Sequence, residues 1–242
     1  MKTKSIGIIS GAGPMAGVLL TKKIIELCQK KYGCIDDKDF PKIILFSYPF
    51  SEMLKPNTKN QNEKKVKKEL KDAIDFLIDS KSDYITIACN TLHAFLNSNK
   101  ADDRLINLIF ETKRFLFKKN LSKVLILSTK TSALKNIFDF DKTKLLSKQD
   151  QKWIDKLIEK ILSGFFSLKD QKRLENFIFK QIKKDPSIDC VLLGCTELSV
   201  LMDDFLKKIS NIKIIDPLEI ISKKLCKLIF TTNQKGEKKC LQ

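Results

Sequence analysis

The segment around Cys89 brings four reactive groups together, a thiol, an amide, a hydroxyl and an imidazole, in Cys89, Asn90, Thr91 and His93. A thiolate is a base and a nucleophile, and a helix that begins near Asn90 would favour an anion through its free N–H groups and positive dipole end. His93 comes four residues after Cys89, which is one helical turn. The segment therefore predicts a site that transfers protons or binds a carboxylate.

A second cysteine, Cys195, has comparable neighbours. It follows a glycine and precedes the hydroxyl of Thr196 and the carboxyl of Glu197. A single cysteine after an apolar run is usually structural, because free cysteine packs as a small hydrophobe. Two cysteines in matching surroundings favour a shared chemical role, so we expect Cys89 and Cys195 to be catalytic and the other five to be core or surface residues.

An internal repeat places these two cysteines in equivalent positions. Residues 83–89 (DYITIAC) match residues 189–195 (DCVLLGC), and in both an aspartate leads into an apolar run that ends at the cysteine. Earlier in each half another apolar run ends in small polar residues, at Ser10 and at Thr129. Each half is thus predicted to contribute two strands with polar side chains at their carboxyl ends.

The elements that must position these residues are short strands that alternate with helices. Runs that are apolar on both faces predict buried parallel strands over residues 6–9, 43–46, 84–88, 124–127, 190–193 and 212–215. Apolar residues three and four positions apart predict helices over 66–78, 157–162 and 174–182. This alternation predicts a doubly wound α/β fold with parallel sheets. Ligands of such folds bind at the carboxyl ends of the strands, so both cysteines are expected at one cleft.

The repeat also predicts the domain organisation. We expect a first lobe over residues 1–98 plus 211–230, a second lobe over 99–210, and a polar, disordered tail over 231–242. Residues 6–20 follow two lysines and could be taken for a short signal peptide. Two glycines and a proline interrupt that stretch, however, and favour a strand, a turn and a helix.

The composition disfavours nucleic acid and membranes as partners. The formal net charge is +17, but only three of the 46 basic residues are arginine, which base reading and phosphate clamps favour. The lysines are mixed with acidic residues, so we expect a solvated surface that attracts small acidic substrates. No apolar run approaches the roughly 20 residues that span a bilayer. Seven cysteines without metal-like spacing fit a reducing, cytoplasmic compartment and no metal.

Three segments resemble the signatures of a known family. Residues 9–14 (ISGAGP), 88–93 (ACNTLH) and 193–198 (LGCTEL) are similar, in order and separation, to those of the aspartate/glutamate racemase family, in its aspartate racemase branch. The resemblance implies two Rossmann-like lobes related by pseudo-twofold symmetry, with the active site in the cleft between them. It also implies racemisation of an acidic amino acid without pyridoxal phosphate or any other cofactor. One cysteine would remove the α-proton as a thiolate, and the other would return a proton to the opposite face.

The α-proton of an amino acid is far less acidic than a thiol, so the site must stabilise a carbanion-like transition state. We expect substrate-binding hydrogen bonds from polar side chains at the four strand ends, namely Asn90, Thr91, Thr196, Ser10 and Thr129. His93 and Glu197 are expected to support them by setting the protonation of the thiols or by binding the substrate ammonium group.

The chain departs from the family pattern where a second substrate carboxylate would bind. Residues 47–53 (SYPFSEM) contain no arginine, although aspartate racemases commonly have one there. A family lysine that precedes a glycine is matched only approximately, by Lys160 ahead of Gly164. The substrate is therefore left open between aspartate, glutamate and a broader set of amino acids.

Other functions compete with racemisation. Residues 11–16 satisfy a G-x-G-x-x-A dinucleotide-binding pattern, but the acidic residue expected after the second strand is missing. A hydantoin racemase, a decarboxylase or an isomerase of the same superfamily is an alternative, although a decarboxylase needs only one proton donor. A non-catalytic small-molecule-binding protein is another. The sequence leaves open whether the chain acts as a homodimer.

Overall fold

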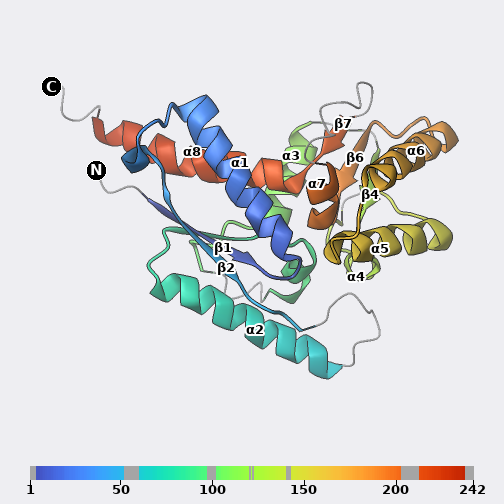
Figure 1. Cartoon of the computed structure of the whole chain (residues 1–242), viewed down its shortest axis with the longest axis horizontal. Coiled ribbons are helices and arrows are strands. Elements are labelled where there is room, and N and C mark those ends of the chain that lie inside the picture. The colour runs from blue at the N-terminus through green and yellow to red at the C-terminus, as the bar shows by residue number, and fades with distance from the viewer. Residues whose placement is uncertain are drawn as a thin grey trace.

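Two parallel sheets, one in each half of the chain, organise the protein (Figure 1). The computed structural model describes residues 4–51, 60–96, 102–119, 121, 123–139, 143–202 and 213–237. Both sheets consist of parallel strands covered by helices, so the predicted α/β fold with parallel sheets is confirmed.

The first sheet has the order β2-β1-β3, formed by β1 (Ser5–Ser10), β2 (Lys42–Ser47) and β3 (Tyr84–Ile87). Helices α1 (Pro14–Tyr32) and α2 (Asn60–Asp79) cover its opposite faces (Figure 1). β1 is buried along its whole length, as its apolar run predicts. β2 lies at the edge and is partly exposed, so the expectation that every strand is buried on both faces is wrong for this strand.

The second sheet has the order β5-β4-β6-β7. It comprises β4 (Val124–Leu127), β5 (Thr143–Lys144), β6 (Cys190–Leu193) and β7 (Lys213–Ile215). The helices of this half are α3 (Leu108–Lys118), α4 (Lys130–Leu134), α5 (Lys148–Leu162), α6 (Leu168–Lys184) and α7 (Thr196–Met202). Apolar stripes of α5 and α6 pack with β4 and β6 in one core cluster.

The two sheets repeat one arrangement. In each, the first strand of the half lies in the centre, the second strand lies on one side, and the cysteine-bearing strand lies on the other. β1 pairs with β3 as β4 pairs with β6, and Cys89 and Cys195 each follow the latter strand. The repeat in the sequence therefore has a counterpart in the strand order.

Two of the expected lobe boundaries need correction. β7 pairs with β6 in the second sheet, because its three residues extend the open edge of that strand, so it does not return to the first lobe. Residues 104–106 bond to Ile85 of β3, so the first sheet extends past residue 98. The boundary residues themselves, 97–101 and 203–212, lie outside the described part of the chain.

Helix α8 (Pro217–Glu237) packs along α1 and α3 (Figure 1). Its buried apolar side chains join the core beneath α1, and the ring of Phe230 stacks on Tyr32 with 4.3 Å between centroids. The helix continues to Glu237, so residues 231–237 are helical rather than disordered, while 238–242 lie outside the described residues.

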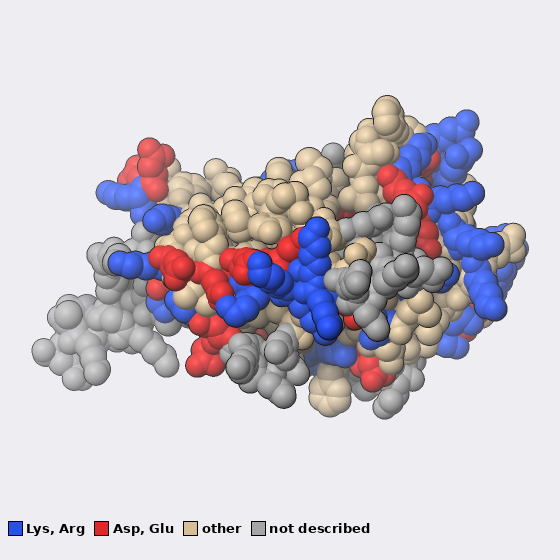
Figure 2. Space-filling model, turned by 90° about the horizontal axis from the view of Figure 1, so that it is seen from below, with Lys and Arg blue, Asp and Glu red and all other residues tan. Residues whose placement is uncertain are grey.

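Charged side chains of both signs share the surface. On the face seen in Figure 2, acidic side chains lie among the lysines and arginines. On α2, Lys68 and Lys71 each pair with an aspartate four residues later. Such pairs fit the solvated, lysine-rich surface expected from the sequence. Within the described residues, every helix is too short or too polar to cross a membrane.

Candidate active site

A cavity of about 160 Å³ has both predicted catalytic cysteines in its wall. The wall is formed by residues that follow the ends of β1, β2, β3, β4 and β6, together with the end of α5. These residues are Ala12, Gly13, Phe50, Ser51, Cys89, Thr91, Thr129, Leu162, Cys195 and Glu197. The thiols of Cys89 and Cys195 are close enough for a charge on Cys89 to raise the pKa of Cys195.

Cys89 lies between β3 and a short 3-10 helix, η2 (Thr91–Phe95). Its side chain is 5% exposed. Burial, and then the charge of Glu197, raise the pKa of the Cys89 thiol to about 12, while the N–H groups of Leu92 and Thr91 act in the opposite direction. The predicted donors to a thiolate are thus present at this strand end, but desolvation outweighs them.

His93 supports the backbone rather than the thiol. Its Nδ1 hydrogen-bonds to the carbonyl oxygen of Cys89 at 2.8 Å, and its Nε2 is buried without a hydrogen-bond partner in the described residues. Burial lowers the pKa of the ring to about 4, so it is neutral at pH 7. The sequence places His93 one helical turn after Cys89, and the ring does reach residue 89, but it contacts the backbone carbonyl oxygen there.

Cys195 and Glu197 form a direct pair at the end of β6. The Sγ of Cys195 donates to Oε2 of Glu197 at 3.0 Å, and Oγ1 of Thr196 donates to the same oxygen at 3.3 Å. Burial and the neighbouring carboxyl raise the pKa of Cys195 well above its usual value. Burial also raises the pKa of Glu197, whose Oε1 lacks a hydrogen-bond partner in the described residues.

Gly13 makes room for the Glu197 carboxyl. It precedes α1 with a φ of 87°, and a Cβ atom built on it would lie 1.5 Å from Oε1 of Glu197. The G-x-G pattern of the sequence thus serves a close approach between the first turn of α1 and the acidic side chain beside Cys195. Glycines in phosphate-binding loops let a ligand approach the backbone closely because they lack a Cβ. Gly13 does the same for the Glu197 carboxyl.

A hydroxyl network joins the strand ends of the two sheets. Oγ1 of Thr91 lies 2.9 Å from Oγ of Ser132 and 3.3 Å from Oγ1 of Thr129. Thr129 in turn caps α4 by accepting from the Ser132 N–H at 3.1 Å. Nearby, Nδ2 of Asn90 donates to the carbonyl oxygen of Leu193 at 3.4 Å. These bonds hold the cysteine-bearing loop of the first half against the second half.

We expect Thr91→Val to lower the free energy of unfolding by about 1–3 kcal/mol, because valine keeps the shape but removes the two buried hydrogen bonds that join Thr91 to Thr129 and Ser132, which keep their bonds to each other. Urea denaturation measures this loss. Thr112→Val is a matched control, since Thr112 is also buried but, among the described residues, its hydroxyl bonds to Leu108 of its own helix and not across the sheets. Equal losses in the two variants would contradict a role for the network in joining the halves.

The remaining expected substrate-binding residues lie outside the wall. Ser10 donates to the carbonyl oxygen of Pro14 at 3.0 Å and packs against Gly17, so it is used by the first turns of α1. Asn90 and Thr196 lie one residue from the cysteines but are absent from the cavity lining that the structure describes. Lys160 pairs with Asp170 at 2.7 Å and does not line the cavity either.

The family resemblance pointed to residues 47–53 as a substrate-binding segment, but sequence reasoning did not predict that Phe50 and Ser51 line the cavity. Both the N–H and the Oγ of Ser51 donate to the carboxylate of Glu69, at 2.9 and 2.7 Å. Glu69 is buried on α2, three residues after Val66 and four before Ala73. The sequence signal for this contact is an acidic residue on the apolar stripe of a helix. A buried carboxylate requires hydrogen-bond donors, so Glu69 indicates that another segment packs against α2 there.

Several known proteins with a similar sequence or fold are named amino-acid racemases. The chain is 23% identical over 228 residues to the broad specificity amino-acid racemase RacX of Bacillus subtilis, covering 90% of this chain and 95% of that protein. The aspartate racemase of Picrophilus torridus superposes with a TM-score of 0.75 at 26% identity, covering 93% of this chain and 94% of the other. A glutamate racemase of Francisella tularensis in complex with D-glutamate has the same fold, with a TM-score of 0.64 at 20% identity. The match covers 96% of this chain and 83% of the other.

The family model described as Asp/Glu/Hydantoin racemase matches residues 9–225, which include both cysteines and all five strand ends around the cavity. The named relatives are racemases and hence isomerases. The chain belongs to the Asp/Glu/Hydantoin racemase family.

Proposed function

We propose that the protein is a cofactor-independent amino-acid racemase in which Cys89 and Cys195 act on opposite faces of the α-carbon. Its substrate is aspartate, glutamate or a broader set of amino acids. The observation that carries this proposal is the presence of both thiols in the wall of one small cavity, at equivalent ends of two sheets. Family membership supports the same reaction class.

Racemisation needs two proton carriers. A thiolate removes the α-proton and becomes a thiol, and the electron pair of the C–H bond stays on the substrate as a carbanion. The second thiol then gives its proton to the opposite face and becomes a thiolate. A single base would tend to return the proton to the face from which it came. Both cysteines are therefore required, and their protonation states are exchanged after each turnover.

Glu197 is suited to bind the substrate ammonium group. Its carboxyl lines the cavity beside Cys195, and Oε1 is free to accept a hydrogen bond among the described residues. An ammonium group there would offset the negative charge that raises the pKa of both thiols. Substrate binding would thus promote formation of the thiolate that the reaction needs.

The wall hydroxyls and the N–H groups beside Cys89 would receive the substrate carboxylate. Thr91 and Thr129 already hydrogen-bond to each other, so their positions are fixed before the substrate arrives. Preorganised donors lower the energy of a carbanion-like transition state without further rearrangement. The cavity also limits access of water to the carbanion.

We expect kcat/KM to rise with pH between pH 6 and pH 8, by up to about tenfold per unit, because the free enzyme must lose a proton from a thiol of raised pKa.

Removing the charge of residue 197 in Glu197→Gln should lower the pKa of both thiols, since a nearby anion disfavours a thiolate. Alkylation by iodoacetamide, followed at each cysteine by mass spectrometry, should therefore be faster at a given pH.

Glu111→Gln provides the control for this comparison, because Glu111 is equally buried but pairs with Arg114 and Lys224 on the far helices α3 and α8. Its alkylation profile should match that of the wild type. A pH profile of Glu197→Gln identical to the wild type would show that the carboxyl does not act on the thiols.

Deuterium exchange tests the proposed function directly. Purified protein in D₂O without added cofactor should replace the α-proton of one or more amino acids and interconvert their enantiomers, as read by NMR and chiral chromatography. The panel contains both enantiomers of aspartate, glutamate, neutral and basic amino acids, and a 5-substituted hydantoin. Turnover of the hydantoin alone would move the assignment to that branch of the family, and no turnover at all would overturn it.

A further inference from the structure

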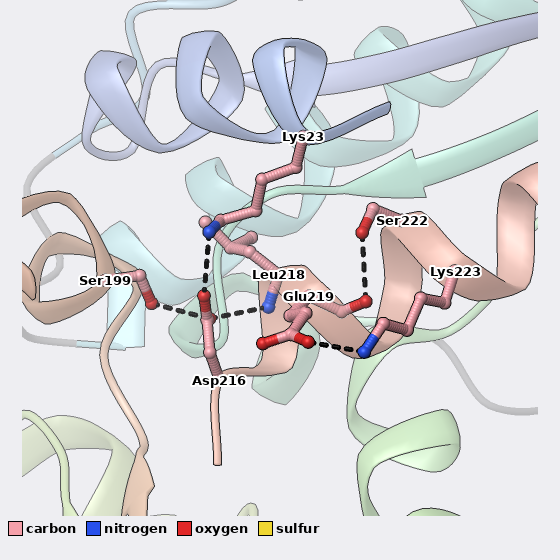
Figure 3. Close-up of polar contacts among 7 residues, drawn as sticks. All are labelled: Lys23, Ser199, Asp216, Leu218, Glu219, Ser222 and Lys223. Atoms are coloured by element: carbon pink, nitrogen blue, oxygen red, sulfur yellow. Dashed lines mark hydrogen bonds and ion pairs between the residues drawn. The ribbon is translucent and has the colours of Figure 1, made fainter. Parts of the chain in front are cut away.

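Asp216 is a buried carboxylate outside the cavity that joins three helices (Figure 3). It precedes α8, and its side chain is 1% exposed. Oδ1 accepts from the N–H of Leu218 in the first turn of α8 at 2.9 Å, and from Oγ of Ser199 in α7 at 2.8 Å. Oδ2 lies 3.5 Å from Nζ of Lys23 in α1. One side chain thus contacts α1, α7 and α8.

Helix α7 carries half of the candidate active site. It begins directly after Cys195 and contains Glu197 in its first turn. The N–H of Leu198 bonds to the carbonyl oxygen of Cys195 at 3.1 Å, and Ser199, fully buried, lies one turn after the cysteine. The bond from Ser199 to Asp216 therefore fixes the helical turn that holds Cys195 and Glu197.

Helix α1 is linked to α7 at two separate places, directly at its N-terminal end and through Asp216 further along. Gly13 lies against the Glu197 carboxyl, and Lys23 reaches the Asp216 carboxylate that holds Ser199. Gly13 and Lys23 are ten residues apart, about 15 Å along the helix at 1.5 Å per residue. Two contacts at that distance restrain both the position of α7 and its orientation against α1.

The negative charge at Asp216 exceeds what a helix cap needs. Asparagine caps a helix N-terminus as well as aspartate does, without the cost of burying a charge. The carboxylate gains its attraction to Lys23 instead, and that contact links the cap of α8 to α1. Through Asp216, the N-terminus of α8 is therefore connected to α1, whose own N-terminus borders the cavity.

We propose that Asp216 is a positioning residue that sets the distance between the Cys195 thiol and the Glu197 carboxyl, acting through Ser199. The catalytic consequence of this proposal rests on the proposed function. Cys89 is held by a different set of bonds, those of Thr91 with Thr129 and Ser132. Loss of the Asp216 link should therefore affect Cys195, which contacts Glu197 directly, more than Cys89, which senses only the charge of Glu197.

The test compares Ser199→Ala with Ser222→Ala. The first variant removes the bond to α7 and leaves the α8 cap and the Lys23 pair in place. Ser222 is a matched control, because it is fully buried on α8 and, within the part of the chain that the structure describes, its hydroxyl bonds to the carbonyl oxygen of Glu219 in its own helix, at 2.9 Å (Figure 3). We measure alkylation of Cys195 and Cys89 by iodoacetamide at one alkaline pH, with each site quantified by mass spectrometry.

We expect Ser199→Ala to change the alkylation rate of Cys195 by at least about threefold and that of Cys89 by a clearly smaller factor, since misplacement of even about 1 Å has a strong effect at reactive groups in direct contact. Ser222→Ala should leave both rates at the wild-type value. An unchanged Cys195, or equal changes at the two cysteines, would overturn the proposal. This measurement needs no turnover, so it can succeed or fail independently of the racemase assignment.

Turnover adds a second readout. Ser199→Ala should lower kcat by about tenfold or more with KM within about twofold, because positioning of a proton carrier acts on the chemical step. Exchange of the α-proton should slow more for one enantiomer than for the other. Asp216→Asn keeps an acceptor for Ser199 and Leu218, so it should give a smaller selective effect than Asp216→Ala. A folded Asp216→Ala variant with a wild-type ratio of Cys195 to Cys89 alkylation would also overturn the proposal.

Discussion

Cys89→Ser and Cys195→Ser should each lower racemisation by about 10³-fold or more, which is within the range that a positioned proton carrier supplies. Serine is close to cysteine in shape, but its hydroxyl does not ionise as a thiol does, so one face of the α-carbon loses its base. Both thiols line the same cavity, and each variant leaves the other thiol in place. Chiral chromatography of each enantiomer measures the loss.

The two variants should differ in isotope exchange. A variant that retains one functional cysteine can still remove and return a proton on that face, so it should exchange the α-proton of one enantiomer with solvent deuterium without inverting it. The second variant should show the opposite preference. Cys34→Ser is the control, because Cys34 is buried near Asp39 and away from the cavity. Wild-type turnover in both active-site variants would exclude the two-cysteine mechanism.

Gly13→Ala should lower kcat/KM by about 10²-fold or more, because displacement of a catalytic group by about 1 Å can have an effect of that size. The added Cβ would lie 1.5 Å from Oε1 of Glu197, and it cannot be accommodated unless the carboxyl or α1 moves. Either movement changes the contact between Glu197 and Cys195. Steady-state kinetics and thermal unfolding together measure the result.

Gly33→Ala separates this collision from backbone strain. Gly33 also has a positive φ, 70° against 87° for Gly13, but nothing lies within 4 Å of its added Cβ. Both variants should lose about 1–2 kcal/mol of stability from left-handed strain. Only Gly13→Ala should also lose catalytic activity. Equal kinetics in the two variants would show that Gly13 serves the fold alone.

The strands and the pairing of the two cysteines were predictable because both are local features of the sequence. Each of the six predicted apolar runs, four or five residues long, coincides with a strand, and the matching segments 83–89 and 189–195 became equivalent strand ends. Sheet membership was harder to predict. β7 has only three residues, and nothing in them indicates which sheet edge is open to receive them.

The parts of the site that were missed depend on contacts between distant segments. Ser51 lines the cavity because Glu69, 18 residues later, binds its N–H and hydroxyl. Ser132 enters the hydroxyl network because Thr91 approaches it from the other sheet. Ser10 was expected in the site from its place at a strand end, but its hydroxyl bonds to the first turn of α1 instead. The strand ends in the sequence predict where the site lies, whereas contacts between distant segments determine which residues line it.

The path of the chain after β6 makes each half depend on the other to bury its apolar side chains. β7 completes the second sheet, and α8, which follows it at once, buries its apolar side chains against α1 of the first half. A fragment that ended before α8 would expose the apolar side of α1 to water, and a fragment that began after the first half would carry α8 without its partner. Division of this protein for labelling or complementation would therefore succeed only where β7, α8 and α1 stay together.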